Sequence, residues 1–384
     1  MTNDNQHIPS GYKPSPLGII PEDWEVKRLG EVCTHFKSGN TITSKEITEK
    51  GLYPVYGGNG LRGYSNTYTH EGNYILIGRQ GALCGNINYV EGKNYISEHA
   101  IAVQTNENMQ WLKYKLENWN LNRFSESSAQ PGLSVEKLVR YKLSVPTLKE
   151  QNKIADILSL WDAAIAKQTA LIEQLTLRKR GLMQQLLTGK KRLKGFEGEW
   201  EEVKLGELLR ETNELVGSRD IKPVSVGLLG IRLRSDVFDK ELSSDYAKNK
   251  VLTKNQICFG LGTNQIVFDV LLSNNTYCVS PAYKTFCIEK CNPLLFKSLL
   301  SIYTSYLSKK HMIISARQGK SVDFDGLLSE RIHIPTDKEQ NVIASVLVNA
   351  DKEIEIQKQK LEAMQKQKKG LMQVLLTGKK RIKK

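Results

Sequence analysis

Apolar residues recur at alternating spacings of four and three in two long segments of this chain. Such a heptad pattern is typical of a helix that buries one seam against a partner helix. The seam positions are Ile154, Leu158, Trp161, Ile165, Gln168, Ile172, Leu175, Lys179, Leu182 and Leu186 in the first segment, and Ile343, Leu347, Ala350, Ile354, Gln357, Leu361, Met364, Lys368, Leu371 and Leu375 in the second. We therefore predict two long helices that pack against each other.

The two helical segments are copies of one another. The sequence EQNKIADIL begins at Glu150 and EQNVIASVL at Glu339, and this offset of 189 residues holds without a gap along the whole segment. A proline precedes each helix at Pro146 and its copy, and Gly189 and Gly378 stand where a left-handed helix cap is expected. Each predicted helix has about 35–40 residues and is roughly 55 Å long at 1.5 Å per residue.

The regions outside the helices contain strand patterns that also occur twice. NYILIGRQG, from Asn73, and NQICFGLG, from Asn255, each indicate an apolar strand that ends at a glycine turn. With one single-residue gap the two regions align, and both begin with the motif W-x4-L-G-E. The matched positions are Trp24 with Trp200, Gly78 with Gly260 and Ser97 with Ser280. We predict an α+β protein made of two similar domains whose loops have diverged.

Positive charge is concentrated on the two repeated helical segments. Ten basic and four acidic residues lie in Lys149–Lys194, and twelve basic and five acidic residues in Lys338–Lys384, while the whole chain carries +14. Basic stripes of this kind favour a polyanion such as DNA or RNA. Charge alone is equally consistent with a solvated helix face and a basic tail.

Cysteine usage and the candidate catalytic motifs argue against an enzyme. The pair Cys287 and Cys291 lacks the further ligands of a zinc site, and we expect no metal. FGLG at 259–262 and NPLLF at 292–296 faintly resemble amino-methyltransferase motifs, but the glycine spacing is wrong and the second proline is absent. Six cysteines, a polar first segment and no membrane-length apolar run favour a reduced, cytoplasmic protein.

The ordered set of repeated phrases resembles the specificity subunits of type I restriction–modification systems. The resemblance rests on IIPEDWEVKRLGEV (19–32), on VPTLKEQNKIADIL with its repeat IPTDKEQNVIASVL, on GFEGEWEEVKLGEL (195–208) and on the helix ends LLTGKKR. It covers almost the whole chain. It implies target-recognition domains at 1–148 and 191–335, a spacer helix at 149–190, and a second spacer helix with a basic tail at 336–384.

Further expectations about partners come from the same resemblance. The helices would form an antiparallel, pseudo-twofold coiled coil. Because Gln168 and Gln357 each lie midway along their own predicted seam, we also predict from the spacing that their side chains face each other. Each domain would read one half of a bipartite, asymmetric site in double-stranded DNA, and the helices would dock two methyltransferase subunits. A separate restriction subunit would translocate and cut DNA. The chain itself would be non-catalytic and free of cofactors, while its partners would use S-adenosylmethionine, ATP and Mg²⁺.

Candidate DNA contacts are polar residues in the diverged loops. Arginine and glutamine suit guanine and adenine edges, and lysines and arginines suit phosphates. The candidates are Asn59, Arg79, Gln80, His99 and Gln130 in the first domain, and Arg232, Arg234, Asn264, Tyr283, Arg317 and Gln318 in the second. For each of them an ordinary surface position is the competing interpretation.

Three alternatives remain open from the sequence. The chain could be the specificity chain of a type II-like system, a self-contained DNA methyltransferase or nuclease, or a coiled-coil scaffold. Binding of S-adenosylmethionine by the isolated chain would indicate the methyltransferase.

Overall fold

Two compact units make up the chain, and they divide both long helices between them. The computed structural model describes residues 8–81, 83–125, 132–239, 245–315 and 319–382. One unit comprises Met1–Ala170 with Gln359–Lys384, and the other comprises Leu171–Lys358. The first unit is therefore assembled from two separate stretches of chain, whereas the second is continuous.

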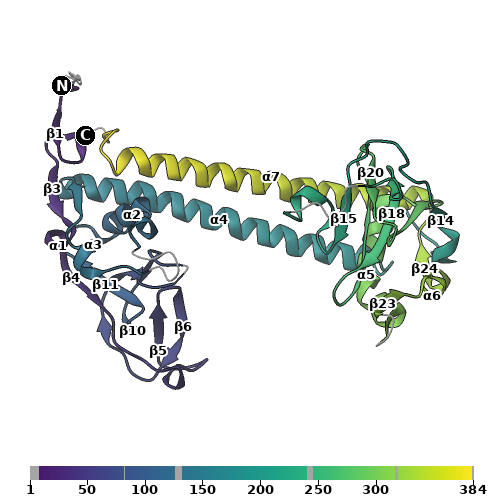
Figure 1. Ribbon diagram of the computed structural model, residues 1–384, viewed down its shortest axis with the longest axis horizontal. Coiled ribbons are helices and arrows are strands. Elements are labelled where there is room, and N and C mark those ends of the chain that lie inside the picture. Colours follow the sequence, from purple (N-terminus) through teal and green to yellow (C-terminus); the bar gives the residue numbers. More distant parts are fainter. Residues whose placement is uncertain (1–7, 82, 126–131, 240–244, 316–318, 383–384) are drawn as a thin grey trace. The chain divides into compact units, whose positions relative to one another are not determined.

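The two predicted helices are present and have equal length. Helix α4 spans Leu148–Leu186 and α7 spans Asp337–Leu375, with 39 residues in each. They run side by side (Figure 1). Every predicted seam position is buried or half-buried, including Gln168. The predicted contact of Gln168 with Gln357 stays a prediction.

Ion pairs show that the helices are antiparallel within each unit. In the first unit, Glu150 pairs with Arg381 just beyond α7, and Asp162 pairs with Lys368 at 2.5 Å. In the second unit, Lys179 pairs with Asp351 at 2.5 Å, and a further pair lies nearer the start of α7. In both units, residue numbers rise along α4 as they fall along α7.

The first unit adds a mixed α+β domain to its helical parts. A four-stranded sheet has the order β4-β11-β8-β9, and a second has the order β6-β5-β10-β7. The strands are β1 Tyr12–Ser15, β2 Gly18–Pro21, β3 Glu25–Arg28, β4 Cys33–Ser38, β5 Tyr53–Gly57, β6 Gly60–Ser65, β7 His70–Glu71, β8 Tyr74–Gly78, β9 Ile87–Val90, β10 Lys93–Ile96, β11 Ala100–Thr105 and β12 Lys142–Val145. The short helices are α1 Leu29–Val32, α2 Met109–Trp119 and α3 Val135–Leu138, with 3-10 turns at Ser44–Glu46 and Leu121–Phe124.

The second unit repeats this architecture. Its four-stranded sheet has the order β14-β21-β18-β19. The strands are β13 Glu201–Lys204, β14 Leu209–Thr212, β15 Val224–Gly227, β16 Gly230–Leu233, β17 Lys250–Leu252, β18 Gln256–Leu261, β19 Ile266–Val270, β20 Tyr277–Val279, β21 Lys284–Ile288, β22 Met312–Ser315, β23 Gly319–Val322 and β24 Arg331–Ile334. The helices are α5 Pro293–His311 and α6 Phe324–Ser329, with 3-10 turns at Leu205–Glu207 and Arg234–Asp236.

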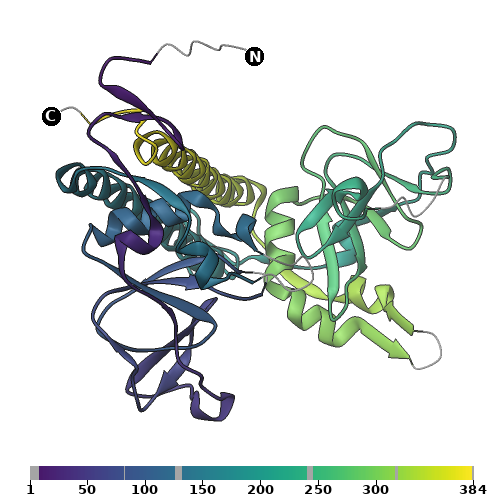
Figure 2. The same cartoon turned by 60° about the vertical axis from the view of Figure 1, so that its left-hand side comes forward.

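Matched strand orders confirm that the two domains share a frame. Strands β4, β11, β8 and β9 correspond to β14, β21, β18 and β19, and the antiparallel pair β3–β12 corresponds to β13–β24. The predicted strands at 73–81 and 255–262 are β8 and β18. The second unit also has the ribbon β22–β23, which extends away from its sheet (Figure 2). The loops, not the frame, distinguish the domains.

The repeated glutamate of the EQN phrase forms a buried clamp in the first unit. The carboxylate of Glu150 accepts a hydrogen bond of 2.8 Å from the indole N–H of Trp24. It also accepts two bonds of 2.9 Å from Arg381, which lies just after α7. Hydrogen bonds to Asp23 and Glu150 raise the pKa of the Arg381 guanidinium. The start of α4 is thereby joined to the end of α7.

The second unit contains the same clamp with the helices exchanged. Glu339, whose side chain is 1% exposed, accepts hydrogen bonds of 2.7 and 2.6 Å from Arg192, which follows α4. Its carboxylate also accepts the indole N–H of Trp200 at 3.2 Å. The hydrogen bonds to Glu339 raise the pKa of Arg192. Arg192 and Arg381 belong to the basic segments predicted to favour DNA, but both are engaged with carboxylates.

The glutamine and asparagine of the EQN phrase bond the residue that caps a helix of the same domain, α2 in the first unit and α5 in the second. Gln151 accepts the backbone N–H of Asn108 at 2.9 Å, at the residue that caps α2. Gln340 accepts the backbone N–H of Asn292, the cap of α5, at 2.7 Å. The asparagine that follows each glutamine bonds the side chain of the same capping residue. The phrase recurs because each copy ties a long helix to its own domain.

Lys115 is a buried lysine that has no counterpart at the equivalent position of the second unit. Its side-chain nitrogen Nζ donates to the carbonyl of Leu376 at 2.6 Å and to the hydroxyl of Ser144 at 3.0 Å. Burial lowers the pKa of Lys115 to about 7. Counting from the helix caps Asn108 and Asn292, the corresponding position in the second unit is the buried Leu299.

We expect the replacement Lys115→Leu to remove a pH dependence of stability. Between pH 7 and the unfolded pKa of about 10.4, the unfolded chain binds the proton and the folded chain does not, so stability rises with pH by roughly 1 kcal/mol per unit. Urea midpoints measured from pH 7 to 10 should rise for the wild type and stay flatter for Lys115→Leu. Parallel curves would show that Lys115 keeps its proton when folded.

Candidate nucleic-acid interface

Four of the five candidates in the first domain lie together. The backbone N–H of Arg79 donates to the carbonyl of His99 at 2.9 Å. The Gln80 side-chain oxygen lies 3.1 Å from Nδ1 of His99. Asn59 is the exposed residue of the β5–β6 turn, whose Gly58 abuts the His99 carbonyl. The fifth candidate, Gln130, lies outside the described residues.

Sheet pairing and glycine explain why these residues meet. Gly78, at the end of β8, pairs with Ala100 at the start of β11, which brings Arg79 beside His99. A side chain at Gly78 would place its Cβ 2.6 Å from the carbonyl oxygen of Gly58, so only glycine lets the β5–β6 turn approach. The loop predicted from the pattern GRQG thus forms one surface with the turn YGGNG.

In the second domain, the candidates Tyr283 and Arg232 lie at the same hairpin, β15–β16, and Tyr283 packs against the protein itself. The ring of Tyr283 packs on Gly260, where an added Cβ would lie 2.3 Å from it. Its hydroxyl lies 3.4 Å from that of Ser225. Arg232 is the strand partner of Ser225, so its exposed side chain projects from the same face of the β15–β16 hairpin. Tyr283 thus supports the hairpin that carries Arg232.

The turn between β18 and β19 and the ribbon β22–β23 form a second part of this surface. Asn264 is exposed in that turn, and the Lys320 ammonium from β23 bonds the adjacent carbonyl of Thr263. A groove beside the turn is lined by Phe259, Leu261, Pro281, Tyr283, Lys320 and Phe324, among others. The candidates Arg317 and Gln318 lie outside the described residues, between β22 and β23.

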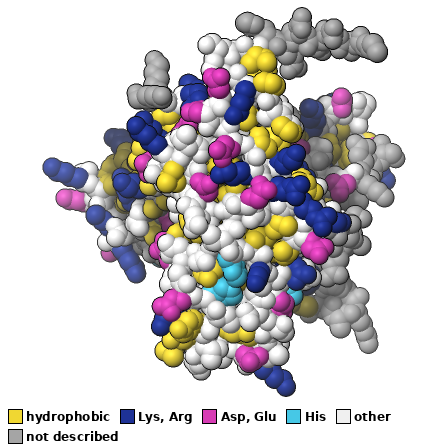
Figure 3. All heavy atoms as spheres, turned by 90° about the vertical axis from the view of Figure 1, so that its left-hand side faces the viewer, with side chains coloured by type: hydrophobic (Ala, Val, Ile, Leu, Met, Phe, Trp, Pro, Cys, Tyr) yellow, Lys and Arg dark blue, Asp and Glu magenta, His cyan; other side chains and the backbone are white. Residues whose placement is uncertain are grey.

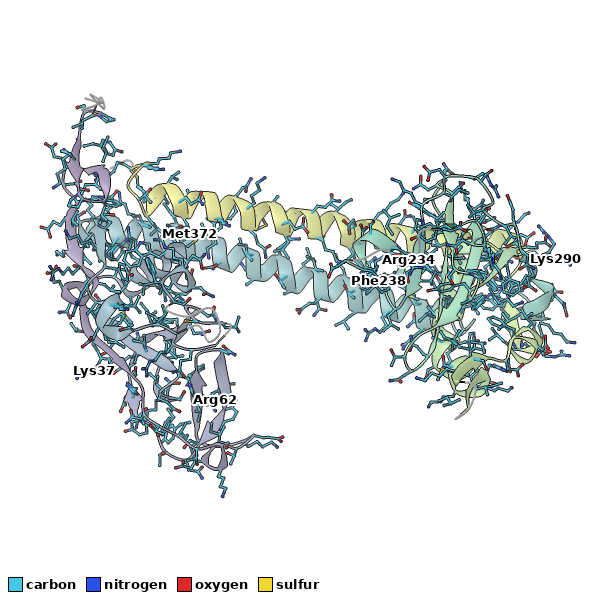
Figure 4. The ribbon with its side chains drawn as sticks, in the orientation of Figure 1. Lys37, Arg62, Arg234, Phe238, Lys290 and Met372 are labelled. Carbon is cyan, nitrogen blue, oxygen red and sulfur yellow. The ribbon has the colours of Figure 1, made fainter. Side chains whose placement is uncertain are left out.

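Arg234 occupies a different setting from the other candidates. Its guanidinium carbon lies 5.5 Å from the centre of the Phe238 ring, and both residues lie side by side in Figure 4. The two side chains line a hollow together with Lys222 and Tyr246. Stacking on an aromatic ring holds the planar arginine in place while its charge remains available.

The described residues offer little for catalysis. Burial raises the pKa of the Cys33 and Cys291 thiols to about 12, so neither is a thiolate at neutral pH. Desolvation lowers the pKa of His35 and of His70, and both rings pack edge-on against Tyr74. Figure 3 shows histidine side chains on a face of the molecule that also carries acidic and basic side chains. No group of three or more His, Cys, Asp and Glu in the described part of the chain is placed to hold a metal ion.

Comparison with protein families identifies the chain. The model of the type I restriction modification DNA specificity domain matches twice, over residues 21–177 and 197–366. The chain therefore belongs to this family. It is a DNA-recognition subunit that works with DNA and other subunits, and catalysis resides in those partners. Within the described residues, no helix has the length and apolar character needed to cross a membrane.

Individual relatives agree with the family match. The chain is 42% identical over 160 residues to the type I restriction enzyme EcoprrI specificity subunit of Escherichia coli, a match that spans 39% of each chain. It is 27% identical over 414 residues to the MjaVIII specificity subunit of Methanocaldococcus jannaschii, covering 95% of this chain and 94% of that one.

Solved structures show the same fold. The S subunit of a type I restriction–modification system from M. genitalium matches with a TM-score of 0.58 and 12% identity, over 92% of this chain and 96% of that one. A chain from a structural study of the assembly and conformational transition of the type I system matches with a TM-score of 0.59 and 15% identity, over 94% and 99%.

The clamp residues are the functional feature that the sequence patterns did not reveal. Trp24, Glu150 and Arg381 each stand within a repeated phrase, so repetition marked them as a set. The phrases themselves give no pairing, because the tryptophan and glutamate are 126 residues apart. Their repetition in the second unit, at Trp200 and Glu339, was the available signal.

Proposed function

We propose that the two domains read the two halves of a bipartite, asymmetric DNA site, and that α4 and α7 dock two methyltransferase subunits. The observation that carries the proposal is a duplicated frame with diverged loops. The same four-stranded order occurs in each domain, yet the turn after β5 has Gly58 and Asn59 where the turn after β15 has Leu228 and Leu229. Equal frames with unequal loops suit a reader of two different half-sites.

The physical division of labour supports this proposal. Affinity for DNA comes mainly from lysine and arginine on phosphates, and specificity from a few side chains at base edges. The exposed candidates Asn59 and Gln80 in the first domain and Asn264 in the second lie outside the strands. Gln80 follows the end of β8 at Gly78, and Asn264 follows the end of β18, whose last residues include Gly260. Helices that begin and end in buried clamps provide rigid attachment for these turns.

The modularity of the readers is the main test. The segment from Leu29 to Val145 can be exchanged with that of a relative while Trp24, Glu150 and Arg381 stay in place. We expect the exchange to change one half of the methylated motif and to leave the other half intact. Base-resolution methylation sequencing of cells that also express the methyltransferase subunits measures this. A change in both halves would contradict independent reading.

The cofactors belong to the partners in this proposal. Methyl transfer would use S-adenosylmethionine bound by the methyltransferase, and translocation would use ATP and Mg²⁺ bound by the restriction subunit. We expect the isolated chain to give no heat of binding with S-adenosylmethionine in titration calorimetry, and its complex with methyltransferase subunits to bind it. Saturable binding by the chain alone would favour a self-contained methyltransferase.

A further inference from the structure

The hairpins β5–β6 and β15–β16 are equivalent elements of the two domains. Gly57 pairs with Gly60 in the first, and Gly227 pairs with Gly230 in the second, so each has a two-residue tip. The glycine after each tip has a positive φ, +95° at Gly60 and +82° at Gly230, which side chains rarely adopt. The backbone geometry of the two turns is therefore matched.

A residue of β9 lies against the first hairpin, and a residue at the matched position of β19 lies against the second. Asn88 pairs with Leu76 in β8, and Asp269 pairs with Cys258 in β18, each two residues before the aligned glycine. A Cβ added to Gly60 would lie 3.6 Å from the side-chain oxygen of Asn88, and a Cβ added to Gly230 would lie 2.3 Å from a carboxylate oxygen of Asp269. Each hairpin thus begins its return strand against the same point of the central sheet.

Asp269 fixes the second hairpin firmly. Its carboxylate accepts the backbone N–H of Ile231 at 2.8 Å and pairs with Lys297 at 2.5 Å. Asp269 is buried, so these bonds to a charged group are strong. Because the turn is held at its base, the two tip residues are displayed at a fixed place.

Each hairpin carries an arginine at the same distance in sequence from its turn glycine; Arg62 lies where the register of β5–β6 shifts, and Arg232 pairs with Ser225. Arg62 and Arg232 both lie two residues after the turn glycine, and both are exposed (Arg62 is labelled in Figure 4). Gly57 makes room for the arginine in the first hairpin, since an added Cβ there would lie 2.6 Å from Cδ of Arg62. Among the described residues neither guanidinium has an acidic partner, whereas Arg192 and Arg381 do.

The tips between these matched positions differ in chemistry. The first hairpin has Gly58 and the exposed amide of Asn59. The second has Leu228 and Leu229, each 76% exposed. Exposure of two apolar side chains to water is unfavourable, which is typical of a surface that binds a partner. The two leucines lie on the same hairpin as Arg232, which has no acidic partner among the described residues.

We propose that these hairpins are equivalent DNA-reading elements, in which Arg62 and Arg232 hold phosphates while Asn59 and the pair Leu228–Leu229 read bases. The proposal rests on the proposed function. An arginine shared by both domains cannot distinguish two different half-sites, so its role is positioning. An amide matches the adenine edge, and leucine matches the methyl group of thymine.

The phosphate contacts are tested by salt dependence. The complex of the full chain with methyltransferase subunits is titrated with a duplex that carries the mapped site, at several salt concentrations. Arg62→Met and Arg232→Met should each weaken binding and lower the salt slope by about one, while Arg→Lys variants retain it and the methylated motif is unchanged. The matched control is Lys290→Met, an exposed cation in the turn after β21.

Two outcomes overturn the phosphate assignment. An equal loss from Lys290→Met would attribute the effect to net charge. A relaxed motif at one position, with no rescue by lysine, would make the arginine a base reader.

The leucine tip is tested by removing single methyl groups from the DNA. Uracil in place of thymine in the half-site read by the second domain should weaken wild-type binding about fourfold per contacted methyl. The variant Leu228→Ala with Leu229→Ala should lose this sensitivity and relax that half of the motif only. If the double leucine variant keeps the wild-type motif and the wild-type response to uracil, the leucines do not read thymine. A half-site of the second domain that contains no thymine would also overturn this role. These failures leave the proposed function intact, whereas a wild-type complex that methylates no bipartite site refutes the function itself.

Discussion

Replacing Arg192 with methionine should destabilise the second unit by about 3 kcal/mol, because it leaves Glu339 buried without its cation. Removing one partner of a buried ion pair typically costs 3–5 kcal/mol, and we expect the lower end because the Arg192 side chain is 23% exposed. The indole N–H of Trp200 would remain as a partner of the carboxylate. Urea unfolding followed by tryptophan fluorescence measures the change.

A matched control and a rescue define this test. Arg178→Met removes an exposed pair with Glu353 whose atoms are 3.9 Å apart, and should change stability by less than about 1 kcal/mol. Adding Glu339→Gln to Arg192→Met removes the isolated charge and should recover part of the loss, since the amide oxygen can still accept from Trp200. If Arg192→Met were as mild as Arg178→Met, the clamp would not stabilise the unit.

Inserting one heptad into the middle of both long helices should lengthen the spacer between the half-sites by about three base pairs. Both helices run unbroken through 39 residues and pass from one unit into the other. Seven residues add roughly 10 Å at 1.5 Å per residue, which corresponds to about three base pairs at 3.4 Å each. A heptad keeps the buried seam in phase, whereas four residues shift it.

Methylation sequencing with each insertion measures the spacer. We expect both half-sites to be retained with seven added residues, and modification to fail with four. DNA rotation or bending can shorten the realised change. Modification at an unchanged spacer would show that helix length does not set the separation.

Features with a local repeat could be predicted from the sequence. The seam from Ile154 to Leu186 has a period that only a helix satisfies, and the strands ending near Gly78 and Gly260 are apolar runs stopped by glycine. Grouping Asn59 with Arg79 was not predictable, because it depends on the close approach of Gly58 to Gly78 across the fold.

Long-range polar contacts were the features that the sequence could not supply. Nothing near Lys115 in the chain indicates that its ammonium group lies against the carbonyl of Leu376, 261 residues away. Tyr283 has the residue type of a surface contact, yet its ring covers Gly260 and supports a hairpin. Conversely, Arg62 could be matched with Arg232 only once the paired glycines of the two hairpin tips were known, since each arginine lies two residues after that glycine.

The division of the units has a consequence for the order of folding during synthesis. The second unit is one continuous stretch that ends at Lys358, so all of its residues have been made by then. The core of the first unit includes Met372, Leu375 and Leu376, and its clamp needs Arg381. The domain that leaves the ribosome first is therefore completed last. Its buried Glu150 and Lys115 bond Arg381 and Leu376, which are made 231 and 261 residues later.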